Sequence, residues 1–159
     1  MTIPLICHFL IGSPGSGKST LANSLTQVNP NSQIISTDKI RLSLFGNESI
    51  QGDWSLIEEQ VISQIHESIK AEKPVIYDAT NVKKEWRLSL LQQVQNDKVQ
   101  WIAWYLSTPL DICKKWNKQR KRQVPEEVIE ALFRALQENI PETSEGFVAV
   151  NAVDVWSKK

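Results

Sequence analysis

The fold of this chain is decided by the stretch Gly12-Ser13-Pro14-Gly15-Ser16-Gly17-Lys18-Ser19-Thr20. Gly12, Gly17 and the pair Lys18-Ser19 fill the fixed positions of the phosphate-binding loop pattern, and the apolar run 5–11 precedes them as a strand should. Because glycine adopts positive φ without a steric penalty, such a loop can direct several backbone N–H groups at one polyphosphate. All nine residues are therefore candidates for binding the phosphates of a nucleotide.

The residues after Gly17 assign chemistry to this loop. A helix that begins there adds its positive N-terminal dipole to the phosphate site. Lys18 is then expected to reach the β- and γ-phosphates, and the Ser19 hydroxyl to ligate Mg²⁺. The alternative is an ordinary Gly-Ser-rich turn before a helix, which the preceding strand and the Lys-Ser pair disfavour.

Length and composition bound the rest of the molecule. We expect one domain, residues 1–159, with a core large enough to need no disulfide. Lys plus Arg and Asp plus Glu both number 18, so the net charge favours neither a nucleic-acid nor a membrane partner. Cys7 and Cys113 have no Cys or His at metal-ligand spacing, and the N-terminal apolar run is too short to span a membrane. These features predict a soluble cytoplasmic protein with buried thiols.

Strands and helices are predicted to alternate along the chain. Short apolar runs predict strands at residues 5–11, 33–37, 74–78, 99–106 and 147–150. Apolar residues at spacings of three and four predict helices that begin near residues 17, 38, 53, 84, 109 and 125, and 151–159 is expected to be a tail. This alternation predicts a three-layer α/β fold with a five-stranded parallel sheet and a nucleotide at the carboxyl ends of its strands.

Asp38 follows the second predicted strand, in the sequence Ser36-Thr37-Asp38-Lys39-Ile40-Arg41. A carboxylate at this place could accept a proton from an acceptor hydroxyl. Arg41 lies one helical turn further on the same face, where its guanidinium could hold a phosphate of the acceptor. The alternative for Asp38 is a helix N-cap, and both roles could coexist because capping uses one carboxylate oxygen.

Asp78 ends the third predicted strand and precedes Ala79-Thr80-Asn81. Nucleotide-binding folds of this kind keep an acid at this place for the Mg²⁺ shell or its waters. The alternative is a buried structural aspartate that binds the neighbouring loop.

The segment 114–122 contains six basic residues and no acid. Such a run is usually a solvated helix face. Its place between two predicted helices near the phosphate end of the fold favours a mobile lid, approximately residues 114–125, whose cations stabilise the transition state of phosphoryl transfer. The run could equally contact the backbone of an acceptor nucleic acid.

The chain resembles the polynucleotide-kinase-like group of P-loop ATP-dependent kinases, whose type member is the kinase domain of the phage 5′-hydroxyl polynucleotide kinase. The resemblance rests on the phosphate-binding loop, on Asp38-x-x-Arg41 and on Asp78-x-Thr-Asn with Arg87, in that order. Later stretches, Asn117-x-x-Arg120, Val124-Pro125 and 141–147, extend it over nearly the whole chain. The resemblance implies a nucleoside/nucleotide-kinase-like P-loop NTPase fold with a small helical lid.

Roles of individual residues follow from the resemblance by position. It implies that Lys18 and Ser19 bind ATP and Mg²⁺ and that Asp38 is the general base. It also implies that Arg41 contacts the acceptor phosphate and that Asp78 organises the metal site.

The lid arginine is left between two candidates. Arg120 matches the family position by its distance from Asn117. The gap to Val124-Pro125 is shorter here than in the phage enzyme, which leaves Arg122 as a competitor for the nucleotide phosphates.

These observations predict a kinase that transfers the γ-phosphate of ATP to a hydroxyl. Members of the group phosphorylate RNA ends, tRNA-linked groups and small molecules, so the acceptor is left open between a polynucleotide 5′-hydroxyl and a nucleoside or other small molecule. The alternative from another class is a nucleotide-gated regulatory ATPase. A GTPase is disfavoured, because Arg120 stands where the guanine-reading pattern Asn-Lys-x-Asp has its aspartate.

Overall fold

A computed structural model describes residues 3–48 and 50–155, which form five strands, six α-helices and one 3-10 helix. The strands are β1 (Leu5–Ile11), β2 (Gln33–Ser36), β3 (Val75–Asp78), β4 (Val99–Leu106) and β5 (Ala149–Val153). The helices are α1 (Lys18–Val28), α2 (Thr37–Phe45), α3 (Trp54–Lys70), α4 (Lys84–Gln93), α5 (Leu110–Lys118) and α6 (Glu126–Glu138), with the 3-10 helix η1 at Thr143–Glu145. No helix in these two ranges has the length and hydropathy that a membrane crossing requires.

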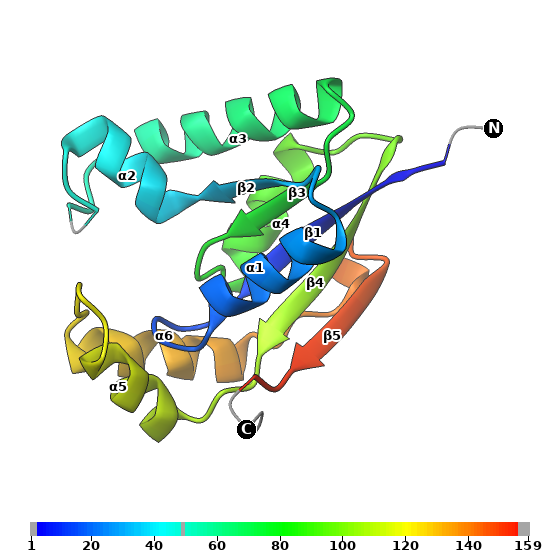
Figure 1. The fold of residues 1–159 in the computed structure, drawn as a ribbon. Coiled ribbons are helices and arrows are strands. Elements are labelled where there is room, and N and C mark those ends of the chain that lie inside the picture. The colour runs from blue at the N-terminus through cyan, green and yellow to red at the C-terminus, as the bar shows by residue number, and fades with distance from the viewer. Residues whose placement is uncertain (1–2, 49, 156–159) are drawn as a thin grey trace.

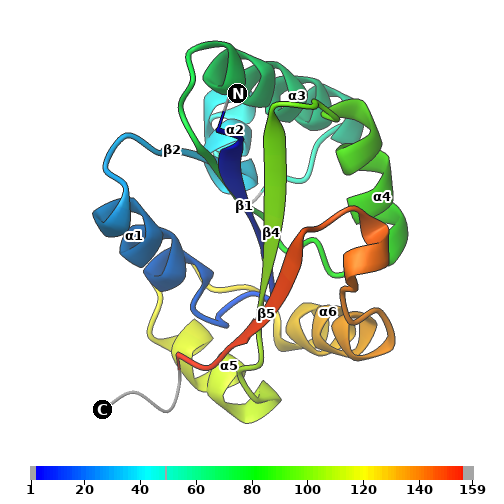
Figure 2. The ribbon, with the colours of Figure 1, turned by 90° about the vertical axis from the view of Figure 1, so that its right-hand side faces the viewer.

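The five strands form one parallel sheet in the order β2-β3-β1-β4-β5. Figure 1 shows α1 in front of this sheet and α2 and α3 beside its β2 edge. In the perpendicular view of Figure 2, α1 lies on one side of the sheet and α4 and α6 lie on the other. The predicted three-layer α/β fold with a five-stranded parallel sheet is therefore confirmed.

The central strand β1 is covered on both faces because its side chains alternate between them. Cys7, Phe9 and Ile11 are fully buried in the larger core cluster, which also contains residues of α3, α4 and α6. Leu10 points to the opposite face, where it packs with Leu21 of α1. A strand with two buried faces is apolar at nearly every position, and the run before the phosphate-binding loop has this composition.

The carboxyl ends of three strands meet at one edge of the sheet. Leu10 of β1 and Ser36 of β2 are both in register with residues of β3, and each aligns with Asp78. The loop after β1 and the start of α2 therefore begin beside the last residue of β3. This register brings the predicted phosphate-binding loop, Asp38 and Asp78 to the same edge.

Several predicted boundaries differ from the structure by one to three residues, and two of them bear on the site or on the extent of the sheet. Helix α2 begins at Thr37, and its N-cap is Ser36, whose hydroxyl accepts a hydrogen bond from the Lys39 N–H at 3.4 Å. Asp38 is thus not the cap of this helix, and both of its carboxylate oxygens are available to other partners. The predicted tail also begins too early, because residues 151–153 pair with Trp104–Leu106 as part of β5, while residues 156–159 lie outside the described residues.

Candidate active site

The phosphate-binding loop joins the end of β1 to the start of α1, and its conformation depends on two glycines. Gly15 has a φ of 79° and Gly17 a φ of 102°, which residues with a side chain rarely adopt. Space also requires glycine, because a Cβ on Gly15 would lie 2.5 Å from the carbonyl oxygen of Cys113 in α5. The loop is therefore packed directly against α5.

The start of α1 offers backbone donors to an anion. Gly17 is the N-cap of this helix. Because glycine has no side chain, no cap side chain occupies the first N–H groups of α1. The Oγ of Ser16 is buried and has no hydrogen-bond partner among the described residues. Lys18 Nζ donates to the carbonyl oxygen of Ser13 at 3.1 Å, which folds this cation back along the loop. Such donors, around a turn that has no room for a Cβ at Gly15 or Gly17, fit the phosphates of a nucleotide.

The other residues of the predicted loop lie on the same turn. The Gly12 N–H donates to the carbonyl oxygen of Thr80 at 2.9 Å, which fixes the loop to the segment after β3. Pro14 is half-buried, and Ser19 and Thr20 are exposed in the first turn of α1.

Lys18 and Asp78 form the charged centre of the site. Burial lowers the pKa of Lys18 below its usual value, and the carboxylates of Asp78 and Asp38 oppose that shift. Burial raises the pKa of Asp78, and the Lys18 ammonium opposes this shift in turn. The structure thus brings Lys18 within electrostatic range of both aspartates.

Asp38 lies between two arginines that come from different parts of the chain. Its Oδ1 is 3.4 Å from Nη1 of Arg41, one turn further along α2. Its Oδ2 is 3.2 Å from Nη2 of Arg122, which belongs to the loop between α5 and α6. The Nε atoms of both arginines are buried and have no hydrogen-bond partner among the described residues. The guanidinium groups therefore keep donors for a further anion beside the carboxylate.

The two lid candidates have different partners. The positive charge of Arg120 acts to lower the pKa of both Lys18 and Asp78, which adds to the effect of burial at Lys18 and opposes it at Asp78. The Arg120 side chain therefore lies within electrostatic range of these two residues. Arg122 contacts Asp38, and its Nε lies 3.9 Å from Oε1 of Glu48, a residue in the segment after α2. The geometry thus divides the two arginines between the two halves of the site.

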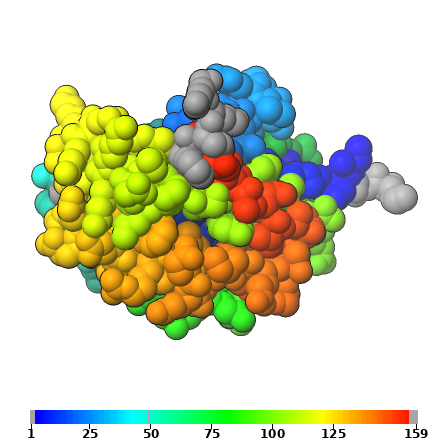
Figure 3. Space-filling model, turned by 90° about the horizontal axis from the view of Figure 1, so that it is seen from below, coloured from blue at the N-terminus to red at the C-terminus, as the bar shows by residue number. Residues whose placement is uncertain are grey.

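The basic segment 114–122 is partly tied to α6. Lys114 Nζ donates to Glu130 Oε1 at 2.6 Å, and Lys118 Nζ lies 3.7 Å from Glu126 Oε1. Lys115 is exposed. Figure 3 shows α5 and α6 side by side, with the residues of their connecting loop at one end of the surface. The segment is therefore a partly paired helix face that continues into a cationic loop.

A magnesium ion at this site would be coordinated by oxygens of the protein together with phosphate oxygens of the nucleotide. The described part of the chain contains no group of three or more His, Cys, Asp or Glu side chains that could hold a metal. It offers the exposed hydroxyl of Ser19 and the carboxylate of Asp78 at the end of β3. Mg²⁺ is commonly held by one or two protein oxygens together with substrate phosphates and waters, so this donor set fits.

Sequence reasoning does not identify two buried residues that hold the loops of the site. Thr108 Oγ1 donates to the carbonyl oxygen of Ser16 at 2.7 Å, from the segment that leads into α5. The side chain of Asn117, at the end of α5, makes two hydrogen bonds to Val124. The sequence signal for Asn117 is its place in the Asn117-x-x-Arg120 stretch of the resemblance, which indicates no bond to Val124.

Arg87, which is part of the resemblance, has a structural environment. Its fully buried guanidinium donates to both carboxylate oxygens of Glu145, at 2.7 and 3.1 Å. It also donates to the carbonyl oxygens of Asn81 and Asn139. Asn81 in turn donates to the carbonyl oxygen of Leu10 at 2.7 Å. These bonds fix the segment after β3 to the end of β1 and to η1.

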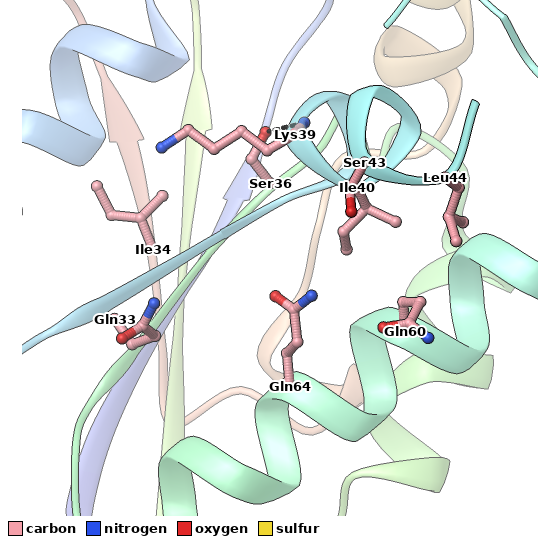
Figure 4. A pocket seen from close by; sticks show the side chains of 9 residues that line it. All are labelled: Gln33, Ile34, Ser36, Lys39, Ile40, Ser43, Leu44, Gln60 and Gln64. Carbon is pink, nitrogen blue, oxygen red and sulfur yellow. Dashed lines mark hydrogen bonds between the residues drawn. The ribbon is translucent and has the colours of Figure 1, made fainter. Parts of the chain in front are cut away.

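A cavity of about 270 Å³ lies at the outer edge of β2. Figure 4 shows side chains of β2, α2 and α3 around it, including Gln33, Ser43, Gln60 and Gln64. Lys18, Asp38 and Asp78 are not among its lining residues. The cavity therefore lies beside the candidate active site, since Ser36 and Lys39, on either side of Thr37 and Asp38, are in its lining.

The glycine-dependent loop between β1 and α1, the parallel sheet and the acids at the strand ends define a P-loop nucleotide-binding protein. The chain belongs to the family described as AAA domain (AAA_33), whose family model matches residues 7–142. The predicted resemblance to a group of P-loop kinases is confirmed by this match together with the similar proteins below.

Two curated proteins are similar to the chain over most of its length. L-seryl-tRNA(Sec) kinase of Methanococcus maripaludis is 29% identical over 129 residues, which cover 78% of this chain and 49% of that protein. Protein kti12 of Schizosaccharomyces pombe is 24% identical over 148 residues, which cover 86% of this chain and 52% of that protein. The chain therefore spans about half the length of the curated relatives it matches.

Solved structures share the fold. The Pnkp1/Rnl/Hen1 RNA repair complex contains a chain with a TM-score of 0.75 and 24% identity, covering 87% of this chain and 45% of that chain. A gluconokinase from Sinorhizobium meliloti 1021 gives a TM-score of 0.60 at 18% identity, covering 99% and 86% of the two chains. Chaetomium thermophilum Kti12 in complex with ADP-AlF3 gives a TM-score of 0.61 at 19% identity, covering 98% of this chain and 92% of that chain. At these identities the likeness shows the fold alone.

Proposed function

We propose that this chain binds ATP with Mg²⁺ and transfers the γ-phosphate to a hydroxyl of an acceptor. The observation that carries the proposal is the position of Asp38. Its carboxylate lies between Arg41 and Arg122 and within electrostatic range of Lys18. A carboxylate there can take up the proton of a hydroxyl whose oxygen faces a phosphate held on the loop.

In the proposed reaction, Asp38 accepts the proton of the acceptor hydroxyl as that oxygen forms a bond to the γ-phosphorus. The bond between the γ-phosphorus and its bridging oxygen breaks, and ADP leaves. Lys18 and Arg120 stabilise the negative charge on the transferring group, and the backbone donors of residues 12–20 hold the remaining phosphates. Mg²⁺, when bound with Ser19 and Asp78, neutralises further charge on the phosphate oxygens.

We propose acceptors that carry a phosphate near the hydroxyl, with a polynucleotide 5′-hydroxyl as the first candidate. Arg41 and Arg122 keep guanidinium donors beside Asp38, and the exposed lysines of segment 114–122 lie near the same loop. The names of two similar proteins, a seryl-tRNA kinase and an RNA repair complex, support a nucleic-acid acceptor. A nucleoside or another small molecule is the alternative, which the likeness to a gluconokinase supports.

The experiment is transfer from γ-labelled ATP to a panel of acceptors. The panel contains 5′-hydroxyl RNA and DNA, nucleosides, nucleoside 3′-phosphates and a cell metabolite extract. Label in the 5′-hydroxyl polymers or the 3′-phosphates supports a phosphate-bearing acceptor. Label confined to an unphosphorylated metabolite overturns that choice and keeps the kinase, whereas strict selectivity for GTP overturns the kinase itself.

A nucleotide-gated ATPase is the second candidate, because the Arg122–Asp38 ion pair joins the α5–α6 loop to α2. A bound nucleotide that attracts Arg122 would release this contact and change the surface of the loop. This candidate predicts ATP hydrolysis that no acceptor in the panel accelerates.

We extend the proposal to the remaining sequence expectations. Residues 114–125 act as the lid of a single P-loop domain, since α5 packs on the phosphate-binding loop and the following loop carries the arginines. A cytoplasmic location is supported by Cys7 and Cys113, which are both buried free thiols.

A further inference from the structure

The loop between α5 and α6, residues 119–125, carries both candidate lid arginines, and its two ends are joined by one side chain. The Nδ2 of Asn117 donates to the carbonyl oxygen of Val124 at 2.8 Å, and its Oδ1 accepts from the Val124 N–H at 2.9 Å. The backbone carbonyl of Asn117 accepts from the Arg120 N–H at 3.1 Å. Arg120 and Arg122 thus lie on a ring that Asn117 closes.

The environment of Asn117 makes this closure hard to open. The residue is 2% exposed, and both ends of its amide bind the backbone of a single residue, Val124. A loop that moved away would leave a buried donor and a buried acceptor without partners, which costs the full desolvation of both groups. The closure therefore restricts the loop to the shape in which Val124 stays on α5.

The same residue lies at the contact between α5 and the phosphate-binding loop. A Cβ on Gly15 would be 3.4 Å from the backbone N of Asn117 and 2.5 Å from the carbonyl oxygen of Cys113. Before the first turn of α5, Thr108 holds the carbonyl oxygen of Ser16. Helix α5 is thereby attached to the phosphate-binding loop on one side and, through Asn117, to the arginine-bearing loop on the other.

We infer that Asn117 is a positioning residue that holds Arg120 near the phosphate-binding loop and Arg122 beside Asp38 by closing the α5–α6 loop onto α5. The inference rests on the proposed kinase function for the use of the arginines. The closure itself is a property of the chain that can be measured without any acceptor.

The first test measures the closure by limited proteolysis with trypsin, because the loop contains Arg120, Lys121 and Arg122. Asn117→Ala is expected to raise the rate of cleavage in this loop by about tenfold, since cleavage requires the segment to leave its folded shape. Gln123→Ala is the matched control, because it removes an exposed bond in the same loop, from Gln123 Nε2 to the carbonyl oxygen of Lys118. An unchanged cleavage rate in folded Asn117→Ala overturns the inference.

Asn117→Asp provides a second variant if Asn117→Ala does not fold. It keeps the oxygen that accepts from the Val124 N–H and loses the donor to the Val124 carbonyl oxygen. The expected cleavage rate lies between that of the parent protein and that of a fully opened loop, and a rate equal to the parent's overturns the inference.

The second test uses kinetics to separate positioning from a general structural effect. Asn117→Ala is expected to lower kcat by about 10²-fold with KM for ATP nearly unchanged. The arginines act in the transfer step, and once misplaced they no longer support it. In a protein that already carries Arg120→Ala and Arg122→Ala, the same substitution is expected to lower kcat by less than about threefold. Effects that multiply in full contradict positioning through the arginines.

The failures of the two ideas are distinguishable. A parent protein that transfers label to no acceptor contradicts the proposed kinase, while the proteolysis result still decides whether Asn117 closes the loop. An active parent protein with normal turnover in folded Asn117→Ala contradicts only the inference about Asn117.

Discussion

Two arginine–carboxylate pairs of this molecule use the same chemical groups in opposite ways. Arg87 and Glu145 are both fully buried, and their side chains meet through two hydrogen bonds. Arg122 and Asp38 meet through a single contact of 3.2 Å, with 25% and 39% of their side chains exposed. The first pair joins α4 to η1, and the second joins the α5–α6 loop to α2.

The difference is one of completeness. The Arg87 guanidinium also donates to two backbone carbonyl oxygens, and Glu145 also accepts from the Glu142 N–H, so both groups are fully engaged inside the fold. The Arg122 Nε and the Arg41 Nε have no hydrogen-bond partner among the described residues, although the Arg122 Nε lies 3.9 Å from Glu48 Oε1. Breaking a saturated, buried pair leaves an uncompensated charge in the interior, whereas the unsaturated pair at the surface keeps donors for the acceptor that we propose.

The largest expected effect is on turnover at the unsaturated pair. Asp38→Asn removes the proposed base and retains its size, so kcat is expected to fall by about 10²- to 10⁴-fold. Binding of ATP, measured by calorimetry, is expected to persist because the phosphate-binding loop is unchanged. Full turnover in this variant would falsify the assignment of Asp38 as base and leave the binding of nucleotide intact.

The next largest effect is on stability at the saturated pair. Arg87→Met leaves the Glu145 carboxylate buried without its cation, and the free energy of unfolding is expected to fall by about 3–5 kcal/mol. Denaturant unfolding measures this loss. The double variant Arg87→Met with Glu145→Leu is expected to regain part of it, since no buried charge then remains. A loss below about 1 kcal/mol for Arg87→Met contradicts the structural role.

The corresponding change at the unsaturated pair is expected to have little effect on stability. Arg122→Gln removes an ion pair that water partly screens, so the free energy of unfolding is expected to change by no more than about 1 kcal/mol. The same denaturant unfolding experiment, run beside Arg87→Met, gives the contrast directly. If the two variants lose equal stability, the division into a structural and a functional pair is wrong.

The smallest expected effect concerns a neutral polar pair, which extends the comparison to a contact without charge. Trp104 Nε1 donates to His8 Nδ1 at 2.9 Å, and burial lowers the pKa of His8 below its usual 6.5. The unfolded chain then binds the proton first as the pH falls, so stability is present above pH 6.5 and decreases below it. His8→Phe is expected to lose less stability than the parent between pH 7 and pH 5, measured by urea unfolding. Equal losses contradict a role for His8 in this pH dependence.

Much of the fold is predictable from the sequence because its signals are local. The fixed positions of residues 12–20 predict the loop, and the strands β1 and β4 have the predicted bounds, since buried parallel strands read as continuous apolar runs. Errors occur where the deciding partner is distant. Residues 151–153 lack a strong strand pattern, and their pairing with β4 extends β5 beyond the predicted end.

The candidate site divides in the same way. Parallel strands end at one edge of a sheet, so the acids that follow β2 and β3 could be assigned to one site from the sequence. The position of Arg122 against Asp38 could not be assigned, because the two residues are 84 positions apart and a shift of one or two residues in the loop would exchange Arg122 for Lys121 or Arg120. The sequence left Arg120 and Arg122 as competitors, whereas the tertiary structure gives them different partners.

By itself, the sequence determined the glycine-dependent phosphate loop, the alternation of strands and helices, and the acids at the strand ends, because each depends on residues close together in the chain. Only the tertiary structure decided which charges are saturated. The Arg87–Glu145 pair and the Arg122–Asp38 pair both depend on how distant segments pack together, and this packing buries the first pair completely and leaves the second partly exposed.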